Sequence, residues 1–268
     1  MGSAPDGAAA AFHDHFSGHA AHYAAHRPTY PPALFDWLAG VAPGRALAWD
    51  VATGNGQAAL ALAQHFDRVV ATDASPQQIA QAPAHPRVAW HVEPAERSRL
   101  APQSVDLVTV AQALHWFDVP AFHAEVARVL RPGGVVAAWC YAVHSVTPAV
   151  DAVVGHLYTD LTGPCWPPER ALLEDGYRTL PWPWQPVAPM PGWELVVSWR
   201  LAELVGYLET WSGVQRYRAA HGHDPVARVA AELAAAWGAP ETVRQVRWPL
   251  HVRVGRHAGV PRNSSAPA

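Results

Sequence analysis

A short glycine-containing segment and two aspartates form a pattern that suits a ligand carrying a ribose. Residues 50–60 are DVATGNGQAAL, and residues 54–59 satisfy the spacing G-x-G-x-x-A that marks dinucleotide-binding loops. Glycines in such a loop let the backbone approach its ligand closely. Asp73 lies 17 residues past Gly56, where a carboxylate could bind ribose hydroxyls. On the loop alone, NAD is therefore a candidate ligand.

Asp50 favours a different ligand. It lies at the end of the predicted first strand, and we expect its carboxylate to face the bound molecule. The pyrophosphate of a dinucleotide is anionic and would be repelled there. S-adenosylmethionine (SAM) carries a positive amino group and a ribose diol, and it has no phosphate. Asp50 for the amino group, the glycines for close approach and Asp73 for the diol form a consistent set, so the residues favour SAM over NAD.

Ala52 stands where a third glycine could be expected. We predict that the backbone is still extended at this residue and needs no positive φ. On that expectation SAM still binds, and the methyl group of Ala52 at most shifts the ligand slightly.

Strands and helices alternate along most of the chain, which predicts an α/β fold with a doubly wound, Rossmann-like sheet. The last predicted strand alternates apolar and polar residues, which is typical of a partly exposed antiparallel strand. We expect seven strands with the last one antiparallel, at residues 45–52, 68–73, 87–92, 105–113, 135–142, 194–201 and 244–255. The predicted helices cover 31–40, 57–65, 75–82, 119–130, 148–161, a segment from 201, and 225–237. Ligands of such sheets bind at the carboxyl ends of the strands.

The composition indicates a single domain between two ends that are rich in polar or small residues. We predict disorder at 1–11 and at 257–268, around a domain at 12–256. Residues 162–193 are rich in Pro and Trp, and a long irregular connection of this kind is often functional. We expect a cap built from residues 12–40 and 143–192.

The residue counts exclude several classes of protein. All 19 basic residues are Arg, so the chain lacks the lysine of a Schiff-base enzyme or a P-loop NTPase. The net charge of −3 argues against a nucleic-acid partner. The two cysteines form no disulfide framework or zinc pattern, and we predict no metal site. No membrane-spanning run or signal segment is evident, and we expect a cytoplasmic monomer or homodimer.

Several motifs together resemble the class I SAM-dependent methyltransferases. DVATGNGQ is similar to their first motif, D-x-G-x-G-x-G, and departs from it at Ala52. Further similar segments are VVATDAS (69–75), VEPAERSRL (92–100), SVDLVTVAQALHWFD (104–118) and RVLRPGG (128–134). FSGHAAHYAAHRPTYP (16–31) resembles the subgroup that includes trans-aconitate methyltransferase-like proteins, as do GYLETWS and VRWPLHVRVGR. The resemblance covers residues 12–256.

The resemblance implies a set of SAM-binding residues. Asp50, Gly54 and Gly56 would line the methionine and ribose portions, together with the neighbouring Ala52, Asn55 and Gln57. Asp73 would bind the ribose diol. Arg27 could pair with the carboxylate of SAM, and Tyr23 would help it close over the ligand. The remaining implied contacts are Ala74 beside the adenine, Ala95 and Glu96 at the adenine edge, and Ala111, Gln112 and Ala113 under the methionyl part.

His115 is the best-placed candidate for a general base. It follows the fourth predicted strand, where it would face the methyl group, although packing or orientation of SAM would explain it as well. Trp116 would wall the site and favour a sulfonium cation. Trp139 and Tyr141 could shape an aromatic substrate pocket or be plain core residues.

The function that these residues predict is transfer of a methyl group from SAM to a small-molecule acceptor, at an oxygen atom rather than at N, S or C. Because the donor is already activated, the protein mainly has to position the acceptor. Two alternatives stay open. One is a SAM-binding cyclase or pericyclase on the same fold, because the loop does not distinguish it. The other is an NAD(P) oxidoreductase.

Overall fold

The computed structural model describes residues 28–258. The predicted disorder at 1–11, and most of the tail at 257–268, lie outside these residues. Strands are β1 Leu47–Val51, β2 Arg68–Asp73, β3 Val88–Val92, β4 Val105–Ala111, β5 Leu130–Cys140, β6 Gln185–Pro186, β7 Trp193–Trp199 and β8 Arg244–Arg256. The α-helices are α2 Pro32–Val41, α3 Gln57–Leu62, α4 Pro76–Gln81, α5 Val119–Val129, α6 Pro148–Gly155, α7 Arg170–Glu174, α8 Leu201–Glu209, α9 Ser212–His221 and α10 Pro225–Trp237. Short helical turns are η2 Leu114–Trp116, η3 His156–Leu161 and η4 Gly163–Cys165.

The central sheet confirms the predicted α/β fold. Its strand order is β3-β2-β1-β4-β5-β8-β6, and β1 to β5 pair in parallel. The last strand, β8, pairs antiparallel with β5, as predicted. The order reverses between β1 and β4, so the carboxyl ends of these neighbouring strands form the crevice in which ligands of such sheets bind.

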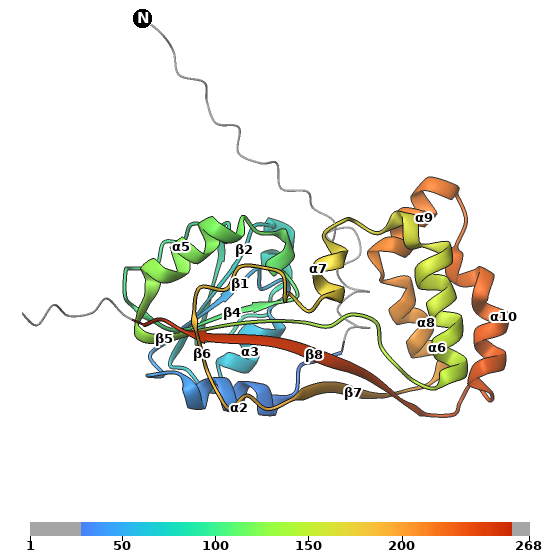
Figure 1. Cartoon of the computed structure of the whole chain (residues 1–268), viewed down its shortest axis with the longest axis horizontal. Coiled ribbons are helices and arrows are strands. Elements are labelled where there is room, and N and C mark those ends of the chain that lie inside the picture. Colours follow the sequence, from blue (N-terminus) through green and yellow to red (C-terminus); the bar gives the residue numbers. More distant parts are fainter. Residues whose placement is uncertain (1–27, 259–268) are drawn as a thin grey trace, which may run out of the picture.

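Helices cover both faces of this sheet (Figure 1). Successive residues of a strand point to opposite faces, so Ala48 packs with α2 and α3, whereas Trp49 packs with Phe122 of α5. Leu34 and Phe35 of α2 are buried on the first face. Covering both faces explains why the parallel strands are continuously apolar rather than alternating.

The strand predicted at 194–201 occupies a different place from the sixth position of the sheet. β8 runs far beyond the end of β5, whose pairing with it ends at Cys140 and His251. The first half of β8 therefore needs another partner, and β7 pairs with it antiparallel from Trp193–Leu250 to Trp199–Arg244. The two-residue β6 takes the outer position of the main sheet instead.

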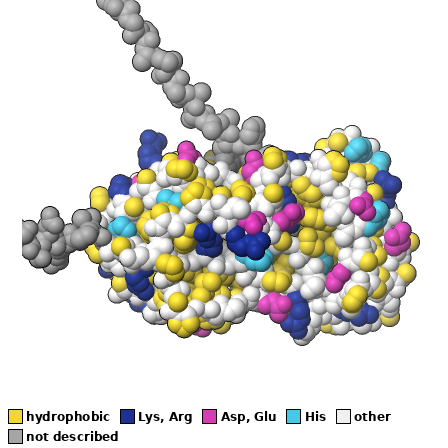
Figure 2. All heavy atoms as spheres, viewed as in Figure 1, with side chains coloured by type: hydrophobic (Ala, Val, Ile, Leu, Met, Phe, Trp, Pro, Cys, Tyr) yellow, Lys and Arg dark blue, Asp and Glu magenta, His cyan; other side chains and the backbone are white. Residues whose placement is uncertain are grey.

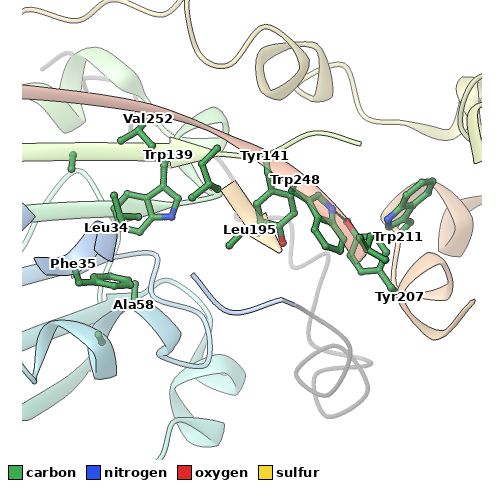
Figure 3. Packing of buried hydrophobic residues seen from close by; sticks show 14 of the residues in the cluster. Leu34, Phe35, Ala58, Trp139, Tyr141, Leu195, Tyr207, Trp211, Trp248 and Val252 are labelled. Carbon is green, nitrogen blue, oxygen red and sulfur yellow. Dashed lines mark hydrogen bonds between the residues drawn. The ribbon is translucent and has the colours of Figure 1, made fainter. Parts of the chain in front are cut away.

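A lobe of helices stands at the far end of β8, and in Figure 1 it contains α6, α8, α9 and α10. Its core is continuous with the α2–α3 face of the sheet, because one cluster of buried residues joins Trp139 in β5 to Trp248 in β8 and Trp211 before α9. Figure 3 shows these rings in succession, from Phe35 to Trp211. Sheet and helical lobe are therefore held by one hydrophobic core.

His144 lies inside this aromatic core. Its ring is 5.4 Å from the Trp248 ring and 5.5 Å from the Tyr207 ring, centroid to centroid. Neither ring nitrogen has a hydrogen-bond partner among the described residues. Burial lowers the pKa of His144 to about 3, so the imidazole is neutral at pH 7.

This burial predicts acid sensitivity. The folded-state pKa of His144 lies below its unfolded value of about 6.5, so the unfolded state binds the proton first. Its contribution to stability is complete above pH 6.5 and is lost as the pH falls toward 3. Between pH 8 and 5 the loss should be about 2 kcal/mol, at about 1.4 kcal/mol per pH unit below the unfolded pKa. Urea unfolding at both pH values measures the free energy of unfolding. Its decline between them should be smaller in His144→Phe than in the unchanged protein by about that amount.

The control is His223→Phe, which changes a histidine that lies exposed in the helical lobe. This control variant should show the same difference in the free energy of unfolding between the two pH values as the unchanged protein. An equal decline of the free energy of unfolding in His144→Phe and in the unchanged protein would contradict the lowered pKa of His144.

Candidate active site

The glycine loop between β1 and α3 is tied to the end of β2. The backbone N–H of Thr53 donates to the carbonyl of Thr72 at 2.9 Å. The backbone N–H of Gly54 donates to the Asp73 carboxylate, also at 2.9 Å. Gly56 has a φ of +92° and begins α3, and a side chain there would meet the ring of Trp90 at 2.3 Å. The loop therefore needs glycine at this position for both its conformation and its space.

Asp50 is buried beneath the loop. Its carboxylate accepts hydrogen bonds from Thr53 Oγ1 at 2.5 Å and Thr109 Oγ1 at 2.6 Å, and the residue is 1% exposed. Burial raises the pKa of Asp50 to about 6, against the opposing effect of the two hydroxyls. The geometry therefore gives Asp50 a role in holding the loop against β4, and its direct contact with an amino group stays a prediction.

Ala52 differs from the expectation. Its φ is +50°, in the left-handed region, and not extended as predicted. The residue follows β1 and turns the chain into the loop, at the position where the family motif has its first glycine. The alanine thus carries a backbone strain of about 1 kcal/mol that a glycine would avoid.

The residues after β2 and β3 lie beside the loop. Both Asp73 oxygens accept backbone N–H groups, from Gly54 and from Ser75, and the residue is 8% exposed. Ala74 follows it directly. Ala95 and Glu96 lie beyond β3, where the Glu96 carboxylate accepts the backbone N–H of Asp118 at 3.0 Å. The parallel pairing of β1, β2 and β3 brings these predicted contacts to one edge of the sheet.

At the end of β4, Gln112 leaves the strand with a φ of +59°. This turn ends β4 at Ala111, two residues earlier than predicted. The Gln112 side chain then continues the pairing with β5, because its amide donates to the Tyr141 carbonyl at 3.2 Å and accepts the Tyr141 N–H at 3.0 Å. A strained residue locked by a bidentate contact is typical of a functional site. Ala113 follows, directly before η2.

His115 is held by a tyrosine that the sequence did not indicate. Its Nδ1 lies 2.9 Å from the hydroxyl of Tyr177, which is fully buried. This contact holds the imidazole ring in place, whichever of the two groups donates the proton. Burial, with a smaller effect of the Arg170 charge, lowers the pKa of His115 to about 3.

A cavity lies beyond the ends of β4 and β5, facing the helical lobe. Its wall includes Gln112, His115 and Trp116, and Tyr141 continues it from beyond β5. The opposite side comes from later segments, with Trp166, Arg170 and Trp211 among its residues. Four of the predicted site residues therefore meet in one cavity: Gln112, His115, Trp116 and Tyr141.

Trp139 has a different place. It is fully buried against Tyr30 and Phe35, with ring centroids at 5.4 and 6.0 Å, and it is not part of the cavity wall. It lies two residues before Tyr141 and so points to the same face, but deeper in the sheet. Its role is that of a core residue. Tyr23 and Arg27 lie outside the described residues.

Other reactive side chains do not form a second centre in the described part of the chain. Burial raises the pKa of Cys140 to about 12, so its thiol is protonated and a poor nucleophile. Residues 28–258 contain no group of three or more His, Cys, Asp or Glu that could hold a metal ion. No helix in this range is long and apolar enough to cross a membrane.

Comparison with known proteins identifies the family. Residues 49–138 match the family described as a methyltransferase domain. A protein of Dictyostelium discoideum named as a methyltransferase is 32% identical to this chain over 238 residues. The aligned region covers 84% of this chain and 87% of the Dictyostelium protein. A solved structure, described as a type II methyltransferase from Anaeromyxobacter dehalogenans, is 50% identical with a TM-score of 0.81, over 86% of this chain and 98% of that chain. This chain is a class I SAM-dependent methyltransferase.

The residues of the methyltransferase fit SAM as its cofactor. Asp50 and Asp73 put two carboxylates beside the loop, and the charge of Asp73 itself raises the pKa of Asp50. Such a negative field suits a cationic ligand and disfavours a pyrophosphate. Next to Gly54 there is open space, since a Cβ there would meet only Gln78, at 3.9 Å. When bound, SAM supplies a methyl group already activated on a sulfonium.

The loop geometry predicts opposite effects of two matched substitutions in the methyltransferase. Ala52→Gly should raise the free energy of unfolding by about 0.5–1 kcal/mol, because it removes left-handed strain at some cost in chain entropy. Gly56→Ala should lower it by about 2 kcal/mol or more, because the new methyl group meets Trp90. Urea unfolding measures both. A loss of stability in Ala52→Gly, or none in Gly56→Ala, would contradict the loop conformation.

Proposed function

We propose that the methyltransferase methylates a small-molecule acceptor at an oxygen atom, and that it belongs to the subgroup resembling trans-aconitate methyltransferase-like proteins. The observation that carries the proposal is the cavity between the sheet and the helical lobe. His115 and Trp116 contribute to it from beyond β4, and Tyr207 and Trp211 from the lobe. A cavity walled by aromatic rings, with polar side chains among them, suits a small molecule.

The SAM-binding residues of this proposal are those of the sequence analysis. Asp73 is the partner of the ribose diol. The loop backbone from Ala52 to Gln57 supports the ligand, and Asp50 shapes that loop from below. Ala74, Ala95 and Glu96 belong to the adenine side and Ala111, Gln112 and Ala113 to the methionyl side, with Tyr23 and Arg27 as further contacts.

We assign His115 the role of a hydrogen-bonding group in the wall of the site, in place of the predicted general base. Tyr177 engages Nδ1, so only Nε2 is left to face an acceptor. Its lowered pKa also makes it a weak base at pH 7. An acceptor oxygen that is already anionic needs no base. Trp116 and Tyr141 remain the proposed substrate-pocket residues.

The proposal includes the remaining boundaries and partners. The catalytic domain spans 12–256, with cap elements at 12–40 and 143–192, and the protein acts as a cytoplasmic monomer or homodimer. A nucleic-acid acceptor would favour a gathered basic face. On the face seen in Figure 2, basic and acidic side chains are interspersed, which supports a small acceptor.

Asp73 provides the direct test of cofactor binding. Asp73→Asn keeps one side-chain oxygen, so it can still accept from one of the N–H groups of Gly54 and Ser75, and it removes the charge that would hold the diol. Loss of a charge-assisted contact should weaken binding of S-adenosylhomocysteine by roughly 10- to 100-fold, measured by calorimetry.

The matched control is Asp224→Asn, the same change at the start of α10 in the helical lobe. It should bind S-adenosylhomocysteine as the unchanged protein does. NADH binding in place of S-adenosylhomocysteine would overturn the proposal. Screening acceptors for release of S-adenosylhomocysteine from SAM then separates methyl transfer from a cyclase or pericyclase.

The role of His115 predicts the pH dependence of the rate. Because its folded pKa of about 3 lies below the assay range, kcat/KM with the best acceptor should show no His115 ionisation between pH 6 and 8. His115→Gln should lower kcat/KM by less than about 10-fold, since a general base contributes about 100-fold or more. A larger loss, together with a step near pH 6.5 that the variant abolishes, would restore the general-base assignment.

A further inference from the structure

Arg170 is a charged residue in an otherwise uncharged cavity wall. The other wall residues among the described ones are aromatic, aliphatic or neutral polar, and His115 is neutral at pH 7. Arg170 begins α7, which lies in Figure 1 between the sheet and the helical lobe and packs against η2, the turn that carries His115. Besides burial, the positive charge of Arg170 contributes to lowering the pKa of His115.

The guanidinium of Arg170 is held in a fixed orientation. It lies over the ring of Trp166, 4.8 Å from its centroid, and over that of Tyr158 at 5.3 Å. Its Nε donates to the Tyr158 hydroxyl at 2.7 Å, and that hydroxyl in turn bonds to Glu174. Stacking on two rings with one anchored nitrogen leaves little rotational freedom to lose when a ligand binds.

The two terminal nitrogens of this guanidinium have no protein partner among residues 28–258. Only Nε donates a hydrogen bond to a described side chain or carbonyl, and no described carboxylate lies within 4.0 Å of Arg170. A half-buried guanidinium with both Nη groups available presents the fork that binds a carboxylate in a bidentate manner.

The rest of the wall defines the body of the ligand. Trp116, Tyr141, Trp166, Tyr207 and Trp211 bring five aromatic rings to the cavity, against a single cationic group. Rings of this kind bury a flat apolar body by stacking and edge contacts. An aliphatic polycarboxylate would find one counter-charge and would have to bury its other charges unpaired, which is costly.

We propose that Arg170 is the specificity-determining residue of the acceptor site, and that the acceptor is a planar aromatic compound with one anionic group, anchored by the Arg170 guanidinium. This inference rests on the proposed methylation of a small molecule and names the chemical class of that molecule. An anionic acceptor also relieves the repulsion between the guanidinium and a bound sulfonium, so the two ligands suit the same cavity.

The test measures binding rather than turnover. The full chain, saturated with S-adenosylhomocysteine, is titrated by calorimetry with trans-cinnamate, 4-hydroxybenzoate and indole-3-acetate, each beside its neutral amide, and with citrate. At least one acid should bind 10-fold or more tightly than its amide, and citrate should bind more weakly than that acid. Arg170→Met should remove the preference for the acid, because it keeps an apolar chain over Trp166 and loses the charge.

Arg178→Met is the matched control, since Arg178 is exposed and pairs with Asp175 outside the cavity. It should keep the preference for the acid. S-adenosylhomocysteine must bind to Arg170→Met as to the unchanged protein, which shows that the variant is folded. The inference is overturned if no acid exceeds its amide, if the preference persists in Arg170→Met, or if citrate binds more tightly than every aromatic acid. Failure of the unchanged protein to bind S-adenosylhomocysteine would instead be a failure of the proposed function.

Discussion

Two carboxylates at the end of the sheet hold together the region on which everything else depends. Asp50, in β1, joins the loop residue Thr53 to Thr109 of β4, while Asp73, ending β2, accepts the N–H of Gly54. Three neighbouring strands are thereby fixed to one loop. Because buried carboxylates cost free energy unless their oxygens are satisfied, these hydrogen bonds specify the loop conformation as well as stabilise it. The same arrangement leaves a negative field at the edge where a cationic cofactor binds.

Much of this edge could be predicted from the sequence, because its information is local. The spacing of Gly54 and Gly56, the position of Asp73 after an apolar strand, and the alternation of strands with helices all follow from short-range patterns. The left-handed backbone of Ala52 was not predicted, since propensity alone assigns an alanine to extended or helical conformations. The burial of Asp50 was missed for a similar reason: its partner Thr109 lies 59 residues away in the sequence.

The acceptor side was much less predictable, because distant segments assemble it. His115 was predicted from its place after β4, and the resemblance implied Gln112 as a SAM contact. Arg170, Tyr177 and Trp211 were not predicted, because they reach the same cavity or its histidine from beyond residue 165. The long β8 is what makes this possible, since it extends past the sheet and carries the helical lobe on the same hydrophobic core. Residues in the far wall of the cavity can therefore differ without changing the glycine loop, which we propose as the cofactor site.

The central claim is that the glycine loop and Asp73 form the binding site of SAM in this methyltransferase. A crystal structure with S-adenosylhomocysteine tests it most directly, through the position of the ribose. The account predicts both ribose hydroxyls at hydrogen-bond distance from the Asp73 carboxylate, about 2.5–3.0 Å, with the sulfur facing the cavity beside His115. A ribose bound elsewhere, out of hydrogen-bond reach of the Asp73 oxygens, would contradict it.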